Sequence, residues 1–256
     1  MAFDTDKAKQ FIADTNLPSK PEIFGFDGGL PELKTTQDQA LVVGSNAISF
    51  MAGVDAELRH IIMDSSLFAQ LAASREVDVD TDPLKFFEAY FNNLAVIGWV
   101  IQKKESAEFT FEENTFDVHQ AIIGVITTFL SPIAGAAKAV LAVLTGLRNM
   151  GRDAPFITLF NKQSRHGEIG RFQFTYIYSG PNHGLTAEVM AFSLKADNTL
   201  TQVLFFKLQK GKTSLRRSTG ELSIDVDAMK SLGSQLNVKM KAYRSAYIAS
   251  VDLGDH

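Results

Sequence analysis

The sequence predicts an α+β protein, a single domain in which a mostly antiparallel β-sheet is covered by helices. Helix-type periodicity dominates residues 40–150, whereas alternating β-type segments fill residues 155–226. Turn signals such as SGPNHG and KADNT separate the later segments, which is typical of an antiparallel meander. The 256 residues are 45% hydrophobic, which is enough for one large core. We therefore expect one domain over residues 1–256.

The N-terminal part, residues 1–39, is expected to hold a short amphipathic helix over 6–15, followed by a loop rich in proline and glycine. The segment ALVVGSNAISFMAG (Ala40–Gly53) contains β-branched apolar residues on both sides of Gly44, which indicates at least one strand. Residues 55–74 carry apolar side chains at helical spacing and are predicted to form a helix.

A further helix is expected to begin in TDPLKFFEAYF. Asp82 can accept hydrogen bonds from free N–H groups of the first turn, and Pro83 fits the first helical position, where its missing N–H costs nothing. The residues that follow form a broad apolar face: Phe86, Phe87, Tyr90, Phe91 and Leu94. The next segment, VIQKKESAEFTFEE, is predicted to be a β-hairpin that turns around Lys104–Ser106.

The stretch Val118–Leu147 is strongly apolar, and its one fixed charge is Lys138. Ser131 followed by Pro132 is a helix-start signal near its middle, so we predict two helices rather than one. We expect Lys138 to lie at the edge of a layer, with its ammonium group in water.

The two predicted helices, residues 117–130 and 132–149, are apolar on nearly all sides, which indicates burial in a large core or in lipid. Each is too short to cross a bilayer comfortably, because a span needs about 20 residues. A buried helical hairpin is the commoner arrangement, and a surface that meets the core and the membrane in turn is the alternative.

After Pro155 the pattern changes to β. FITLFNKQ is predicted to be the first strand, and GRFQFTYIYSG the second. The second places four aromatic side chains on one face by its period of two: Phe172, Phe174, Tyr176 and Tyr178. In TLTQVLFFKLQKGK, residues 203–208 are apolar on both faces, which predicts a central strand covered on both sides. A final helix is expected over about 227–249.

No motif in the chain argues for an enzyme. Cysteine is absent, which excludes disulfides, thiolate zinc sites and cysteine nucleophiles. Neither a G-x-S-x-G elbow nor an H-E-x-x-H pair occurs, and the five histidines are scattered. LQKGKTS lacks the first glycine of a phosphate-binding loop, and a proline follows DVDTD where a calcium loop needs glycine. We expect no catalytic residues, no metal and no cofactor. No nucleic-acid partner is expected either, because a matching motif is absent.

A basic late segment lies behind the net charge of −4: residues 207–244 hold 9 basic and 3 acidic residues. Such a segment can meet anionic headgroups or simply balance an acidic face elsewhere. The N-terminus, MAFDTDKAKQ, lacks the basic start and apolar run of a Sec signal. We expect a protein that is made in a bacterial cytoplasm and is released or secreted by a non-classical route.

The order of these elements and one short run resemble the Cyt family of cytolytic δ-endotoxins from insect-pathogenic bacilli. An apolar helical pair is followed by a polar junction, FITLFNKQ, an aromatic strand, a further strand and then TQVLFFKLQ. The last strands of Cyt proteins carry a similar VLFF-x-[IL]-Q run, matched here by Val203–Gln209. The Evf virulence factors of insect-associated bacteria share this architecture. The resemblance extends over about residues 40–236.

The resemblance implies a sheet that is covered on both faces by helical hairpins. It also implies a membrane-active toxin or virulence factor, which is soluble at first, binds phospholipid, and permeabilises target membranes after its helical layers rearrange. Phospholipid or fatty acid would be the partner, and homo-oligomers would form on membranes. A lipid-binding virulence protein that forms no pores is the alternative, and an enzyme of unrecognised type ranks last.

Under this interpretation two sets of residues carry the function, although a core role is the ordinary alternative for the apolar set. The residues expected to meet lipid are Ile122, Ile126, Phe129, Val140, Leu144, Phe172, Phe174, Tyr176, Phe205 and Phe206. The residues expected to meet anionic headgroups are Lys207, Lys210, Lys212, Arg216 and Arg217.

Overall fold

The central strands of the computed structural model bury both faces, because alternate side chains point to opposite sides of a sheet. On β6 (Ile169–Ser179), Phe172 and Phe174 belong to one apolar cluster and Ile177 belongs to the other. The core is therefore divided by the sheet into two parts. The structure describes residues 3–19, 31–78, 83–109, 115–149, 155–180, 184–196, 199–200, 203–204, 207–209 and 214–250.

The main sheet of the described residues has the strand order β10-β1-β2-β6-β7-β9-β3, and β5 pairs with β6 outside this path. Every pairing is antiparallel except that of β2 with β6, which is parallel. The other strands of this sheet are β1 (Gln39–Val43), β2 (Asn46–Phe50), β3 (Trp99–Glu108), β5 (Arg165–His166), β7 (Leu185–Lys195), β9 (Ser214–Ile224) and β10 (Ile248–Ser250).

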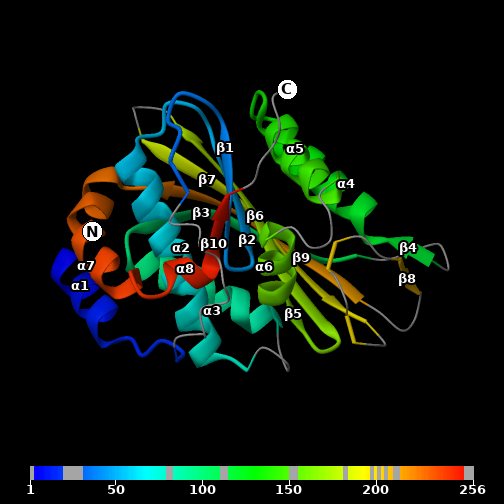
Figure 1. The fold of residues 1–256 in the computed structure, drawn as a ribbon, viewed down its shortest axis with the longest axis horizontal. Helices are drawn as coiled ribbons and strands as arrows, with labels where there is room; N and C mark the ends of the chain where they lie inside the picture. The colour runs from blue at the N-terminus through cyan, green and yellow to red at the C-terminus, as the bar shows by residue number, and fades with distance from the viewer. Residues whose placement is uncertain are drawn as a thin grey trace.

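Helices cover both faces of the sheet (Figure 1). One layer, which we call the α2 layer, contains α1 (Thr5–Asp14), α2 (Ala56–Glu76), α3 (Pro83–Val96), α7 (Val226–Met240) and α8 (Arg244–Tyr247). The opposite layer contains α4 (Val118–Leu130), α5 (Ala136–Asn149) and α6 (Pro155–Ser164). The predicted fold class, a mostly antiparallel sheet between helical layers, is confirmed.

Aspartate begins four of these helices. The side chains of Asp4, Asp55, Asp117 and Asp225 each accept a hydrogen bond from a backbone N–H of the first turn. Such a cap satisfies an N–H that has no partner within the helix, and it stabilises the helix by about 1 kcal/mol. Local sequence therefore fixes where α1, α2, α4 and α7 start.

FITLFNKQ was expected to be a strand, and this prediction is wrong because the segment forms α6. Leu159 and Phe160 are buried among the apolar residues of the α4 side, and Ile157 packs against the same cluster. Pro155 occupies the first helical position, where it fits best. The apolar spacing of Phe156, Leu159 and Phe160 is helical rather than alternating, and it outweighs the β-type composition.

The predicted central strand at residues 203–208 is also wrong. Among the described residues of this segment, Val203 and Leu204 are buried in a bend, and Lys207–Gln209 form the short strand β8. It pairs with β4 (Thr115–Asp117) in a separate two-stranded ribbon. The central position is not available to this segment, because β7 and β9 pair directly with each other over eleven residues.

The predicted hairpin at Lys104–Ser106 is wrong, because β3 continues through these residues. It pairs with β9 from Trp99 to Glu108, with one irregularity between Ile101 and Lys103. In the described part of the chain β3 is an edge strand, and charged side chains are common at edges because they discourage pairing with other chains.

The break between the two apolar helices is confirmed, but the second helix begins at Ala136 rather than at Pro132. Ser131 does not cap it, since its hydroxyl donates back to the Thr128 carbonyl at the end of α4. Gly135 has a φ of +78°, which favours glycine and completes the connection. No helix among the described residues is both long enough and apolar enough to span a bilayer.

The predicted helix over 227–249 ends early. The helix α7 stops at Met240, and α8 and β10 follow it. Two contacts redirect the chain: Arg244 forms an ion pair with Asp64 of α2, and Ile248 pairs with Val43 at the sheet edge. Both partners are distant in sequence, so local periodicity could not reveal this end.

Candidate functional site

The candidate site is the α4–α5 hairpin, residues Val118–Asn149, together with the sheet face beneath it. The helix α4 packs against β7, and α5 packs against β2 and β6. Four of the residues predicted to meet lipid form the docked side of the hairpin and are at most 1% exposed: Ile122, Ile126, Val140 and Leu144. The hairpin is therefore attached to the sheet through an apolar interface.

Aromatic side chains of the sheet lie in the same apolar cluster. Phe172 stacks on Phe192 with ring centroids 5.3 Å apart, and Phe174 meets Phe172 edge-on at 6.1 Å. Phe160 of α6 completes this group. Tyr176 belongs to it as well and is 3% exposed. The structure thus brings together the predicted apolar residues of the helices and of β6.

The outer side of the hairpin is open to solvent, which corrects the expectation of burial on nearly all sides. Thr127, Thr128 and Gly124 of α4 are exposed, and Phe129, which was predicted to meet lipid, is half-buried. Small and weakly polar side chains tolerate water, so one buried face is enough to hold the hairpin. Lys138 is exposed, as predicted.

The predicted basic set is only partly placed. Arg216 and Arg217 lie half-exposed on β9. The Arg216 Nε atom is 3.3 Å from the Glu108 carboxylate, and the Arg217 guanidinium lies 5.9 Å from the centre of the Phe109 ring. Arg216 is thus partly neutralised by an acidic neighbour. Lys207 begins β8, whereas four further predicted residues lie outside the described part of the chain: Phe205, Phe206, Lys210 and Lys212.

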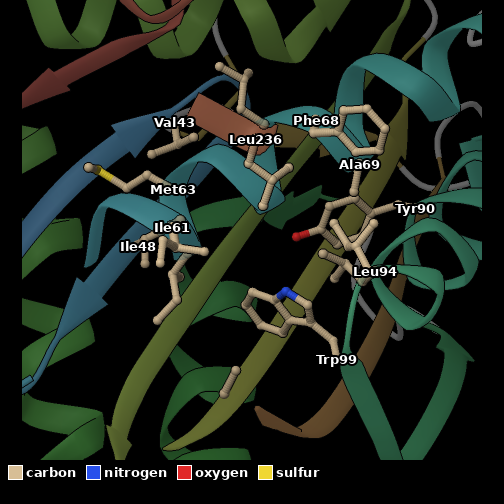
Figure 2. Close-up of a cluster of buried hydrophobic side chains, with 14 of the residues drawn as sticks. Val43, Ile48, Ile61, Met63, Phe68, Ala69, Tyr90, Leu94, Trp99 and Leu236 are labelled. Carbon is tan, nitrogen blue, oxygen red and sulfur yellow. The ribbon is translucent and has the colours of Figure 1, made fainter. Parts of the chain in front are cut away.

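The α2 layer, on the opposite face, is attached through buried polar contacts as well as apolar ones. Gln70 donates to the Val43 carbonyl (3.0 Å) and accepts from the Ser45 backbone N–H (3.0 Å). The Trp99 indole N–H donates to the Ser65 hydroxyl (3.1 Å). Figure 2 shows Trp99 and Tyr90 among the apolar side chains of this layer. These bonds tie α2 to β1 and β3.

A second set of contacts fixes α2 further. Ser66 Oγ and the Tyr90 hydroxyl are 3.2 Å apart, and Asn46 Nδ2 lies 3.3 Å from Ser66 Oγ. At the N-terminal end of α2, the fully buried Arg59 donates to carbonyls of Val54 and Met51. Buried hydrogen bonds of this kind fix position, because breaking them leaves unsatisfied polar groups in the core.

Sequence reasoning missed a nearly buried carboxyl on the α4–α5 face. Glu188 of β7 is 5% exposed, and the Tyr178 hydroxyl donates to its Oε1 atom (3.3 Å). Burial and the nearby Glu221 carboxylate raise the pKa of Glu188 to about 7. Burial and Glu188 itself raise the pKa of Tyr178 to about 12. The sequence contains one signal of this burial: by the two-residue period of a strand, Glu188 lies on the same face as Met190 and Phe192, which are core residues.

The described residues contain no group of three or more histidine, aspartate or glutamate side chains that could hold a metal ion. For two other titratable groups, burial and a neighbouring charge account for the shifted pKa. Burial lowers the pKa of His119 at the start of α4, and the nearby Arg148 lowers it too. Burial raises the pKa of Asp64, although its partner Arg244 opposes this.

No protein-family model and no curated protein matches the chain. Among solved structures, the chain is similar to a δ-endotoxin, with a TM-score of 0.45 and 12% identity over 81% of this chain and 91% of that chain. It is also similar to the activated Cyt2Ba monomer from Bacillus thuringiensis subsp. israelensis, with a TM-score of 0.39 and 11% identity over 70% and 97% of the two chains. For the Evf virulence factor, the TM-score is 0.32 and the identity 8% over 81% and 85%.

Proposed function

We propose that this protein is a membrane-active toxin or virulence factor that binds phospholipid and permeabilises the membrane after the α4–α5 hairpin leaves the sheet. No catalytic role is part of this proposal. The partner is the lipid surface itself, and copies of the chain assemble on it.

One observation carries the proposal: the two helical layers are attached in different ways. Buried hydrogen bonds from Gln70, Ser65 and Ser66 tie the α2 layer to the sheet and to α3. Apart from His119, the buried side chains of the α4–α5 hairpin, such as Ile122 and Val140, are apolar. Lipid tails can replace an apolar surface but cannot replace buried hydrogen bonds. A membrane therefore competes for the α4–α5 interface far better than for the opposite one.

The energies of this competition are closely matched. A fully buried aliphatic side chain gains about 1.5–3 kcal/mol on leaving water, whether the new surroundings are a protein core or lipid. Ile122, Ile126, Val140 and Leu144 therefore lose little when they exchange the sheet for a bilayer. The sheet face, with Phe172 and its neighbours, becomes exposed by the same step and also gains from lipid contact.

The helix lengths indicate how the hairpin would lie in the membrane. With 13 residues in α4 and 14 in α5, each helix is about 20 Å long at 1.5 Å per residue. The hydrocarbon core of a bilayer is about 30 Å thick. We propose that the hairpin lies in the plane of the interface with its apolar side down, as amphipathic helices do.

Dye release from phosphatidylcholine vesicles tests the function. We expect release after the protein is added. Absence of release over a range of pH, lipid composition and proteolytic treatment would exclude permeabilisation. Mass spectrometry of an organic extract would then test the alternative, since a co-purifying acyl chain is expected of a lipid-binding protein that forms no pores.

Site-specific labelling tests which layer meets lipid, because the chain contains no cysteine and accepts a single introduced thiol. An environment-sensitive dye on Phe129→Cys reports α4. The same dye on Phe11→Cys, another half-buried aromatic position, reports α1 on the opposite face. We expect a blue-shifted, brighter emission with vesicles for Phe129→Cys alone. An equal response from both labels would contradict selective release of the α4–α5 hairpin.

A further inference from the structure

We propose that Glu188 is a pH-sensitive latch for the α4–α5 hairpin: its protonated carboxyl belongs to the docked hairpin, and its carboxylate favours release. This inference rests on the proposed function, in which the same hairpin leaves the sheet. It adds the condition under which the hairpin leaves.

Glu188 lies at the border between the covered and the open part of one sheet face. Its cross-strand neighbours are Tyr176 of β6 and Glu221 of β9, and Glu221 in turn is opposite Lys103 of β3. Tyr176 and Glu188 are 3% and 5% exposed, whereas Glu221 and Lys103 are exposed. The row thus passes from the core into solvent within four strands, and Glu188 is its last buried member.

Glu188 lies on the face of the sheet to which the α4–α5 hairpin docks. Glu188 points to the same side of β7 as Met190 and Phe192, which belong to the apolar cluster of α4 and α5. The helix that packs against β7 on this side is α4. When α4 leaves, water reaches this face and the Glu188 carboxyl is solvated.

The polar neighbours of Glu188 do not neutralise its negative charge. Directly opposite residues in a sheet have Cβ atoms about 4.5–5.5 Å apart, so the Glu221 carboxylate repels that of Glu188. The Tyr178 hydroxyl donates one hydrogen bond to Glu188 and is itself uncharged. Lys103 opposes the repulsion, but it forms an ion pair with Glu105 at 2.8 Å.

Among the described residues, the helices on this face supply no compensating cation. Their titratable and basic residues are His119 in α4, Lys138 and Arg148 in α5, and Lys162 in α6. None of them is among the groups that shift the pKa of Glu188, whose electrostatic neighbours are Glu221, Tyr178 and Lys103. Opposite to this face, α3 packs against the other side of β7.

The direction of the pH effect follows from these contacts. In the docked state burial and the Glu221 carboxylate hold the pKa of Glu188 at about 7, and loss of the burial in the released state lowers it toward its ordinary value of 4.5. The docked state therefore binds more protons between these two values, so docking weakens as the pH rises through this window and is constant above it. Neutral to alkaline pH favours release.

The test measures docking without membranes, so it is independent of dye release. Val125 lies on the docked side of α4 and is 4% exposed, and Val125→Cys places one thiol there with little change in volume. The rate of its reaction with an uncharged thiol reagent, divided by the rate in denatured protein at the same pH, gives the fraction of open hairpin. This division removes the intrinsic ionisation of the thiol.

We expect the open fraction to rise between pH 5.5 and 8 by up to about 30-fold, which is the effect of a pKa that moves all the way from about 7 to 4.5 on opening. Glu188→Gln removes this rise. Glu221→Gln moves the midpoint of the rise in open fraction to lower pH, because the loss of a repelling charge lowers the pKa of Glu188 in the docked state. The control is Glu168→Gln, at an exposed glutamate in the turn before β6, and it leaves the profile unchanged.

Two results would overturn the latch: an identical pH profile in the wild type and in Glu188→Gln, or a midpoint that Glu221→Gln does not move. The midpoint of Glu221→Gln also tests the latch if Glu188→Gln fails to fold. The outcomes separate the two proposals. If opening depends on Glu188 but no dye is released, the latch proposal is supported and permeabilisation is excluded. Dye release with a flat opening profile excludes the latch alone.

Discussion

The two helical layers of this protein bury similar kinds of apolar surface, yet they are attached to the sheet differently. In the α2 layer, polar side chains such as Gln70, Ser65 and Arg59 reach backbone and side-chain partners on the sheet and its adjoining loops. In the α4–α5 layer the docked side is built from side chains such as Ile122 and Leu144. Burial alone therefore does not decide whether a layer stays attached to the sheet, because apolar contacts can be exchanged for lipid and buried hydrogen bonds cannot.

The largest effect should come from breaking the buried ion pair of the α2 layer. Arg244 donates through Nε to Asp64 (2.8 Å), and a second bond joins its Nη2 atom to the same carboxylate. Arg244→Ala leaves the nearly buried Asp64 without its cation, so we expect the free energy of unfolding to fall by about 3–5 kcal/mol. Urea denaturation measures it. The exposed pair of Lys7 with Asp4 is the control, and Lys7→Ala should leave the free energy of unfolding nearly unchanged.

Replacing one buried isoleucine in each layer tests whether the two layers open separately. Ile62 in α2 and Ile126 in α4 are both 0% exposed, and replacement of either by alanine should cost about 2–5 kcal/mol. Two probes show which layer loses stability. The single tryptophan, Trp99, reports the α2 side, and a dye on Phe129→Cys reports α4.

We expect Ile62→Ala to shift the denaturant midpoints of both probes to lower concentration. Ile126→Ala should shift the midpoint of the dye and leave that of Trp99 nearly unchanged, because the α4–α5 hairpin separates first. Coincident shifts of both probes in both variants would mean that the layers open together.

A smaller effect is expected from a single hydroxyl of the polar network. Ser66 Oγ lies within hydrogen-bond distance of Tyr90, Asn46 and Gln70. Ser66→Ala leaves these buried groups with fewer partners and should cost about 1–3 kcal/mol in calorimetry. Thr127→Ala, on the exposed side of α4, should stay within about 0.5 kcal/mol of the wild type. A neutral Ser66→Ala would show that the network does not fix α2.

The sequence predicted much of the fold where local signals were strong. The helices expected over 55–74 and 117–130 correspond to α2 and α4, and the break after Leu130 divided the apolar stretch correctly. FITLFNKQ failed because its β-type composition hid a helical spacing, and Val203–Leu208 failed because pairing of β7 with β9 is a long-range choice. Neither choice can be read from a window of a few residues.

The candidate site was predictable only in part, for a related reason. Apolar periodicity identified Ile122 and Phe174 as buried partners without showing that they meet. The cross-strand row of Tyr176, Glu188, Glu221 and Lys103 could not be predicted, because it depends on the register that places Glu188 opposite Glu221. Register is a property of paired strands, and the sequence contains it only implicitly.

Hydrogen exchange of the native protein tests the detachable layer most directly. At low concentrations of denaturant, we expect the backbone amides of α4 and α5 to exchange together through an opening that costs less free energy than global unfolding. The amides of α2 should exchange only through global unfolding. If α4, α5 and α2 all exchange with the same free energy and the same denaturant dependence, the α4–α5 hairpin is a permanent part of the core and the proposed mechanism is wrong.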